Sequence, residues 1–299
     1  MTGDTLSPHA VPWAHWLTAA RPATLPAAVA PVLVGAAAAA DERFRLLVFV
    51  ATLAAAALIQ IGTNFANDLF DFERGADTAD RLGPPRVTQS GLIAPERVRA
   101  GTVIAFGAAA VIGLYLAYIG GWPILAIGAL SIIAGVAYTG GPWPLGYHGL
   151  GDLAVFIFFG LTAVIGTYYL QAETITATAV LAAVPVGFLV TAILVVNNLR
   201  DIETDGRAGK RTLAVRLGDR GTRAQYALLV LGAFAWTPLL LLADGGAWVW
   251  LSWLALPGAL ALSRSVLLGA IGRDLNPVLK WTAQLHFVFG ALLALGLLL

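Results

Sequence analysis

The chain has 299 residues, of which 59% are apolar and 12% are charged, and its formal net charge is +1. A water-soluble domain of this length could not cover so apolar a composition with a polar surface, so the composition indicates a membrane protein. The absence of cysteine excludes disulfides, thiolate metal sites and cysteine nucleophiles, and no separate Lys/Arg-rich run points to nucleic acid.

Apolar runs long enough to cross a bilayer, roughly 17 to 25 residues each, recur along the chain. They predict an all-α membrane protein of about nine transmembrane helices, with Gly-rich turns such as Gly120-Gly121 between neighbouring runs. In chain order the predicted helices cover 22–40, 46–70, 98–119, 122–140, 150–170, 177–199, 223–243, 246–270 and 279–299.

Basic residues fall on one side of the bilayer once these spans are drawn. Of the 18 Lys and Arg residues, all except Arg43 and Arg45 lie at one face, most of them after the second and sixth spans. Because positive charge collects on the inner side of a cell membrane, the N-terminus and both charged loops are predicted to be cytoplasmic.

Two aspartate-rich segments end the second and sixth predicted helices, four spans apart, so both run the same way through the bilayer. This favours a single domain over 1–299, with a parallel repeat of helices 1–4 and 5–8 followed by helix 9. Spacings of three and four place the acidic and amide side chains of each segment on one helical face. They are Asn64, Asp68 and Asp71 in the first segment, and Asn197, Asp201 and Asp205 in the second.

Oxygen ligands without His or Cys suit a hard cation, and Mg²⁺ commonly binds through a few carboxylates together with substrate phosphates. Diphosphate is therefore the predicted ligand, and the basic residues within reach of the two segments are candidate contacts for its oxygens: Arg74, Arg81 and Arg86 after the first, and Lys210 and Arg211 after the second. One acidic helix end is as readily a solvated loop. Two matched ends at one membrane face favour a functional site, because ionisable residues at membrane depth are costly.

A polyprenyl diphosphate joins a headgroup that Mg²⁺ can hold to a tail that only an apolar cavity open to lipid accepts. Loss of diphosphate leaves an allylic carbocation, which favours a dry, aromatic-lined pocket at the centre of the helices. The candidate lining residues are Phe65, Phe70, Tyr138, Phe156, Phe159, Tyr168 and Tyr169, although for each one alone bundle packing is the more common explanation.

These residues resemble the UbiA superfamily of membrane-embedded prenyltransferases, and within it the branch that prenylates 1,4-dihydroxy-2-naphthoate in menaquinone biosynthesis. The similarity runs from the first helix to the last loop. Four stretches carry it: Arg21-Pro22 within 20–26; Asn67-Asp68 and Thr88-Gln89-Ser90-Gly91 within 67–91; Tyr138-Thr139-Gly140-Gly141-Pro142 within 138–147; and Asn197-Asn198-Leu199-Arg200-Asp201 within 197–213.

The resemblance implies Mg²⁺-dependent transfer of a polyprenyl chain to the naphthoate carbon that bears the carboxylate, with release of diphosphate and CO₂ and formation of demethylmenaquinone. It also implies roles for particular residues. These are Asp68, Asp71, Asp201 and Asp205 as catalytic Mg²⁺-diphosphate ligands; Asn64, Asn67, Asn198, Arg81, Lys210 and Arg211 as diphosphate contacts; and Arg21 and Tyr138 for the acceptor carboxylate and the allylic cation.

Three residues keep two interpretations each. Gly75 stands where the superfamily often has a third aspartate, and Asp77 follows two residues later, so its role as a metal ligand stays open. Arg21 is equally consistent with an anchor at the cytoplasmic face. His148 could contact substrate, but a solvated loop residue is the favoured interpretation.

Two other functions remain as alternatives. One is another UbiA branch with a different acceptor, such as 4-hydroxybenzoate. The other is a secondary transporter, which predicts carboxylates deep in the spans for coupling ions. The spans at 98–119, 122–140, 223–243 and 279–299 contain no Asp or Glu, which disfavours transport.

Overall fold

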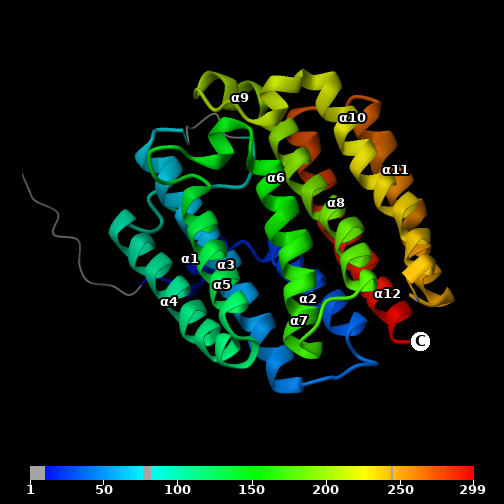
Figure 1. Ribbon diagram of the computed structural model, residues 1–299. Helices are drawn as coiled ribbons and strands as arrows, with labels where there is room; N and C mark the ends of the chain where they lie inside the picture. Colours follow the sequence, from blue (N-terminus) through cyan, green and yellow to red (C-terminus); the bar gives the residue numbers. More distant parts are fainter. Residues whose placement is uncertain (1–10, 77–81, 244) are drawn as a thin grey trace, which may run out of the picture.

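The computed structural model describes residues 11–76, 82–243 and 245–299, and in these ranges the protein is a helical bundle without a strand (Figure 1). The helices of the first half are α1 (Trp13–Ala20), η1 (Pro22–Thr24), α2 (Pro26–Ala38), α3 (Leu46–Glu73), α4 (Pro95–Gly120), α5 (Trp122–Ala137), η2 (Leu145–His148), α6 (Gly151–Val155), η3 (Phe156–Thr162) and α7 (Ala163–Ala172). Those of the second half are α8 (Ala177–Arg200), α9 (Ile202–Arg207), α10 (Leu213–Trp236), η4 (Thr237–Ala243), η5 (Ala247–Ala255), α11 (Leu256–Leu267), η6 (Gly272–Asp274) and α12 (Leu275–Leu297).

Each predicted apolar run contains a helix, but the count of nine spans is not confirmed. Among the described residues, seven helices are long and apolar enough to cross a membrane, or eight if the bent pair at the N-terminus is one span. The apolar helix α5 has only 16 residues, fewer than the roughly 20 that a span needs.

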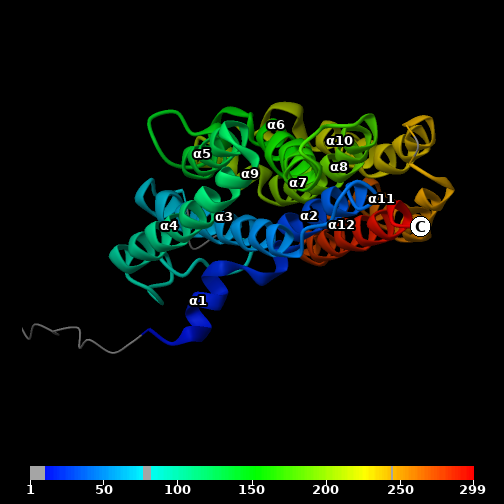
Figure 2. The ribbon, with the colours of Figure 1, turned by 60° about the horizontal axis from the view of Figure 1, so that its bottom comes forward.

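The bend at the N-terminus changes the expected first helix. The segment Trp13–Thr24 meets α2 at 51°, next to Arg21, whose backbone is left-handed, and two prolines that begin η1 and α2. Proline starts a helix readily but disfavours helical geometry in the residue before it. As a result, α1 stands off from the bundle below α2 and α3 in Figure 2.

The helix α10 begins at Leu213, ten residues before the predicted start at 223, but the non-helical backbone of Gly218 (φ 71°, ψ 176°) divides it into two segments. The Thr212 side chain accepts a hydrogen bond from the Val215 amide at 3.3 Å and caps the helix. Asp219 and Arg223 then form an ion pair one turn apart, with 2.7 Å between Arg223 Nε and Asp219 Oδ2. The second segment therefore begins before Arg223, within a charged stretch where a hydropathy pattern stops.

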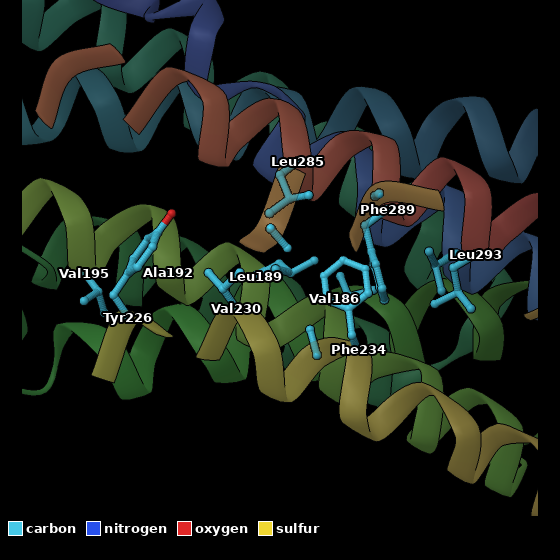
Figure 3. Close-up of a cluster of buried hydrophobic side chains, with 14 of the residues drawn as sticks. Val186, Leu189, Ala192, Val195, Tyr226, Val230, Phe234, Leu285, Phe289 and Leu293 are labelled. Atoms are coloured by element: carbon cyan, nitrogen blue, oxygen red, sulfur yellow. The ribbon is translucent and has the colours of Figure 1, made fainter. Parts of the chain in front are cut away.

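The largest apolar cluster lies where α8, α10 and α12 pack together (Figure 3). Val186, Phe234 and Phe289 come from these three helices, and the two phenylalanine rings meet edge to face with centroids 5.1 Å apart. The buried Tyr226 and Thr282 hydroxyls hydrogen-bond to each other at 2.6 Å, as polar groups inside a membrane bundle require. This half of the protein is a closely packed support for α8.

A π-helix, η3, interrupts the span between α6 and α7. Here Gly160 lies directly against Gly187 of α8, since a Cβ at Gly160 would come within 2.4 Å of the Gly187 Cα. Small residues allow helices to approach this closely. The contact fixes the α6–α7 span against α8. Phe158 and Phe159 of η3 line an apolar cavity between this span and the neighbouring helices.

Candidate active site

Two adjoining cavities occupy the space between α3, α5, the α6–α7 span and α8. One is polar, with a volume of about 230 Å³, and the other is almost entirely apolar, with a volume of about 540 Å³. They share Thr63, Tyr138, Val155 and Phe159 as a common boundary. Such a pair of cavities can hold an amphiphile with its polar and apolar ends in different compartments.

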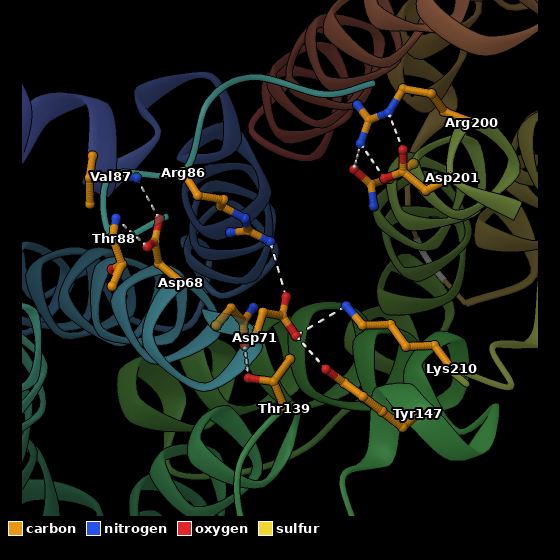
Figure 4. A network of polar contacts seen from close by, with 12 residues as sticks. Asp68, Asp71, Arg86, Val87, Thr88, Thr139, Tyr147, Arg200, Asp201 and Lys210 are labelled. Carbon is orange, nitrogen blue, oxygen red and sulfur yellow. Dashed lines mark hydrogen bonds and ion pairs between the residues drawn. The ribbon is translucent and has the colours of Figure 1, made fainter. Parts of the chain in front are cut away.

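Asp71, in the last turn of α3, is the centre of the polar contacts (Figure 4). Its Oδ1 accepts hydrogen bonds from Tyr147 Oη at 2.8 Å and Lys210 Nζ at 3.0 Å, and Arg86 reaches Oδ2 at 3.3 Å. The Asp71 side chain is buried, so these donors and cations compensate a charge that would otherwise be costly.

Asp201 directly follows α8 and is oriented by the residue before it. Arg200 donates to both carboxylate oxygens of Asp201, with Nε to Oδ1 at 2.9 Å and a terminal nitrogen to Oδ2 at 2.6 Å. Arg200 also reaches the side-chain oxygens of Asn197 and Asn276, both at 2.9 Å. This bidentate pair holds Asp201 across the open space from Asp71, as Figure 4 shows.

The short helix α9 folds Lys210 back towards the cavity. The Asp205 amide donates to the Asp201 carbonyl at 2.8 Å, and the Lys210 amide donates to the Asp205 carbonyl at 2.9 Å. Asp205 and Lys210 consequently line the polar cavity. Arg211 does not line it: this residue is exposed, and its amide donates to the Tyr147 carbonyl at 3.0 Å.

Asp68 lies outside the polar cavity, although the sequence pattern groups it with Asp71. Its two carboxylate oxygens accept hydrogen bonds from the backbone amides of Val87 and Thr88, at 3.1 and 3.0 Å, and the side chain is buried. Asp68 therefore holds the loop after α3 in place, and that loop carries Arg86 to Asp71.

The structure brings most of the other predicted residues together. Asn64 donates to the Ala20 carbonyl at 2.9 Å and to Thr24 Oγ1 at 3.1 Å, which ties α3 to the N-terminal bend. Asp77 and Arg81 lie outside the described residues. The predicted site residues that line the polar cavity are Arg21, Asn64, Asn67, Asp71, Tyr138, Asn198, Asp201, Asp205 and Lys210.

Among the cavity residues that the sequence-based site did not include are Thr24, Gln60 and Tyr147, whereas Arg86 was one of its candidate phosphate contacts. Gln60 donates to Thr24 Oγ1 at 3.0 Å and lies one turn before Asn64, so its polar side chain within an apolar span could have identified it. Tyr147 and Arg86 come from loops, where no helical periodicity indicates which side chains turn inward.

Of the aromatic candidates, Tyr138 and Phe159 line both cavities. Phe65 instead packs edge-on against Trp16, with centroids 5.5 Å apart, and Tyr168 is buried in a separate apolar cluster. His148 lines neither cavity: it stacks on Trp143 with centroids 4.3 Å apart.

The donor set fits a hard cation held partly by its ligand. Within the described ranges, no three His, Cys, Asp or Glu side chains are grouped closely enough to hold a metal ion alone. Asp71, Asp201 and Asp205 nevertheless line one cavity, with amide oxygens beside them. Mg²⁺ typically keeps several waters and uses only one or two carboxylates together with phosphate oxygens.

The chain is similar to known proteins over nearly its whole length. Residues 28–297 match the UbiA prenyltransferase family. The chain is 42% identical to 1,4-dihydroxy-2-naphthoate octaprenyltransferase of Mycobacterium tuberculosis, over 94% of this chain and 96% of that protein. It is 38% identical to the Escherichia coli protein of the same name, over 95% of both.

The fold is also similar to solved structures. A UbiA homolog from Aeropyrum pernix K1 superposes with a TM-score of 0.70 at 17% identity, covering 93% of this chain and 96% of that one. A UbiA homolog from Archaeoglobus fulgidus bound to DMAPP and Mg²⁺ gives a TM-score of 0.63 at 14% identity, covering 93% and 99%.

Proposed function

Because this chain belongs to the UbiA prenyltransferase family, we propose that it transfers a polyprenyl group from polyprenyl diphosphate to 1,4-dihydroxy-2-naphthoate at the cell membrane. Prenyl transfer is the activity of the family. The acceptor is inferred from the relatives at 42% and 38% identity, whose names specify the naphthoate and an octaprenyl group.

The observation that carries this proposal is the boundary between the two cavities. Tyr138 and Phe159 face a polar compartment on one side and an apolar compartment on the other. A prenyl diphosphate placed across it has its headgroup among charged residues and its tail among alkyl side chains. The bond that breaks then lies beside two aromatic rings, which stabilise a developing allylic cation through their faces.

Two basic side chains lie on the wall of the polar cavity, where the diphosphate would bind. Lys210 and Arg86 both contact Asp71, at 3.0 and 3.3 Å, on the wall of the polar cavity. In the proposed complex they turn to the diphosphate oxygens and stabilise the charge of the leaving group. Asp71, Asp201 and Asp205 would hold Mg²⁺, which when bound favours loss of diphosphate by neutralising it.

Bonds and electron pairs balance in the proposed transfer without any reactant besides the prenyl donor and the acceptor. The C–O bond to diphosphate breaks and its electron pair leaves with the diphosphate. The ring carbon bearing the carboxylate supplies the pair for the new C–C bond. Loss of CO₂ from that carbon returns a pair to the ring and yields demethylmenaquinol, the reduced form of demethylmenaquinone. Arg21, on the wall of the polar cavity, is the proposed partner of the acceptor carboxylate.

The purified protein in lipid vesicles tests the proposal. With Mg²⁺, octaprenyl diphosphate and 1,4-dihydroxy-2-naphthoate, mass spectrometry should detect prenylated naphthoquinol and CO₂, and EDTA should abolish both. Parallel reactions with 4-hydroxybenzoate and homogentisate test the acceptor. Product formed only with one of those would assign the chain to another branch, and solute uptake without product would support a transporter.

A further inference from the structure

The apolar cavity has a mouth and a floor. Its mouth is the boundary with the polar cavity at Tyr138. Its floor is formed by Leu116, Ile124 and Leu170, which belong to one buried apolar cluster. From Tyr138 to Ile127, just before the floor, α5 advances eleven residues, or about 16 Å at 1.5 Å per residue.

Gly166 of α7 lies near the deep end of this cavity, opposite Ile127. It is buried and lines the cavity, and a Cβ added to it would meet only the Ile127 side chain, at 3.8 Å. On the α5 wall, Gly128 also lines the cavity, and a Cβ there would have no neighbouring atom within 4 Å. Two helices therefore present bare backbone where larger side chains would occupy open space.

We propose that Gly166, with Gly128 facing the same space, is the position that admits long prenyl tails; this inference rests on the proposed function. A prenyl unit has four main-chain bonds and extends roughly 4.5 Å, by comparison with 3.3–3.6 Å for the three bonds of a residue. Three units from the mouth span roughly 14 Å and end before Gly166. A longer chain that continues towards the floor has to pass it.

The passage is needed by a tail that reaches the floor of the cavity or leaves sideways at its deep end. An eight-unit chain, roughly 36 Å long when extended, exceeds the distance to the floor. The lining includes Leu114 and Leu125, which are 61% and 51% exposed, so the cavity opens to the outer surface beside Ile124. It also includes Ile133, which is 60% exposed and nearer the mouth, and a tail that left there would not pass Gly166. Leu125 lies closer to the floor than Ile127 along α5, so a tail leaving there also passes Gly166.

Gly166→Leu tests the proposal by competition between geranyl, farnesyl and octaprenyl diphosphate in one reaction. We expect the ratio of kcat/KM for farnesyl over octaprenyl diphosphate to rise roughly tenfold or more, since a pocket side chain discriminates by about that factor. Gly107→Leu is the matched control: Gly107 lies within α4, has equal room for a side chain, but is exposed and does not line the cavity. In Gly107→Leu, the ratio of kcat/KM for farnesyl over octaprenyl diphosphate should equal the wild-type ratio.

The outcomes separate the two proposals. Wild-type protein that makes no prenylated product with any donor contradicts the proposed function. Wild-type activity with an unchanged ratio in Gly166→Leu, or with equal loss for all donors, overturns the length proposal alone. Should Gly166→Leu not yield a monodisperse protein, Gly128→Leu, which narrows the same passage from α5, carries the same expectation.

Discussion

Lys210 Nζ lies 3.0 Å from Asp71 Oδ1, and this contact joins residues that are 139 positions apart in the chain. Lys210 Nζ also lies 4.8 Å from the centre of the Tyr147 ring. A cation shared by a carboxylate and a ring face in a buried site is strongly oriented. The two aspartate-rich segments and the loop after α5 therefore form one polar site.

Asp71→Asn should lower kcat by on the order of 100-fold, because it removes the charge that pairs with Lys210 and Arg86 and would hold Mg²⁺. Initial rates at saturating substrates measure this. Glu73→Gln, two residues further along α3, is the control. Glu73 pairs with Arg99 at a more exposed position, so this substitution should leave kcat nearly unchanged. Equal effects of both changes would contradict a specific role for Asp71.

The spacing of the aspartates predicted much of this site, since Asp71, Asp201 and Asp205 do line one cavity. The same spacing could not show that Asp68 faces a loop, because the loop amides of Val87 and Thr88 reach it only in the folded chain. Helical periodicity identifies a shared face but not what packs on it.

The fold was predictable where hydropathy alone decides it. The run at 177–199 corresponds closely to α8. In the apolar 18-residue stretch of this helix, 72% of the residues are buried inside the protein. The prediction was poorest at the N-terminal bend and at the start of α10, where prolines or charge pairs within a helix determine the geometry. Those features depend on single residues rather than on average composition.

Lys210→Met should raise KM for the prenyl diphosphate about tenfold or more, because a donor to the diphosphate is lost. Arg211→Met provides a neighbouring comparison. Both residues are basic and adjacent, but only Lys210 lines the polar cavity, so the Arg211 variant should bind the donor almost normally. Titrations with octaprenyl diphosphate at fixed acceptor concentration distinguish them, and a larger effect from Arg211 would show that the site changes shape on binding.

Asp68→Ala should destabilise the protein by roughly 1–3 kcal/mol, since two buried backbone amides lose their acceptor. Asp68→Asn keeps one carbonyl oxygen as an acceptor, so its stability should lie between those of Asp68→Ala and wild type. Thermal unfolding in detergent measures both. A Mg²⁺ titration of the residual activity should give the wild-type half-saturation in Asp68→Asn. A large shift without loss of stability would instead make Asp68 a metal ligand.

Glu173, in the connection between α7 and α8, should make the stability of the protein depend on pH. A hydrogen bond from Arg45, with Arg43 nearby, lowers the pKa of Glu173 below its ordinary 4.5. A lowered carboxyl pKa contributes stability above the unfolded-state value and loses it as pH falls through the folded-state value. Wild type should therefore unfold at a slightly higher temperature than Glu173→Gln at pH 7, and the difference should be lost as the pH falls below 4.5 through the lowered pKa of Glu173. A constant difference across this range would contradict the ion pair.

The positions of the basic residues predict the orientation in the membrane, and the absence of cysteine makes this prediction testable with single substitutions. The connection between α9 and α10 and the connection between α2 and α3 lie at opposite ends of the bundle in Figure 1. Ala208 in the first connection and Asp41 in the second are both exposed. With the active site facing the cytoplasm, a membrane-impermeant maleimide should label Asp41→Cys in intact cells. Ala208→Cys should react only after permeabilisation, and the cysteine-free parent should stay unlabelled. The reverse pattern would place the aspartates at the outer face, where a cytosolic acceptor could not reach them.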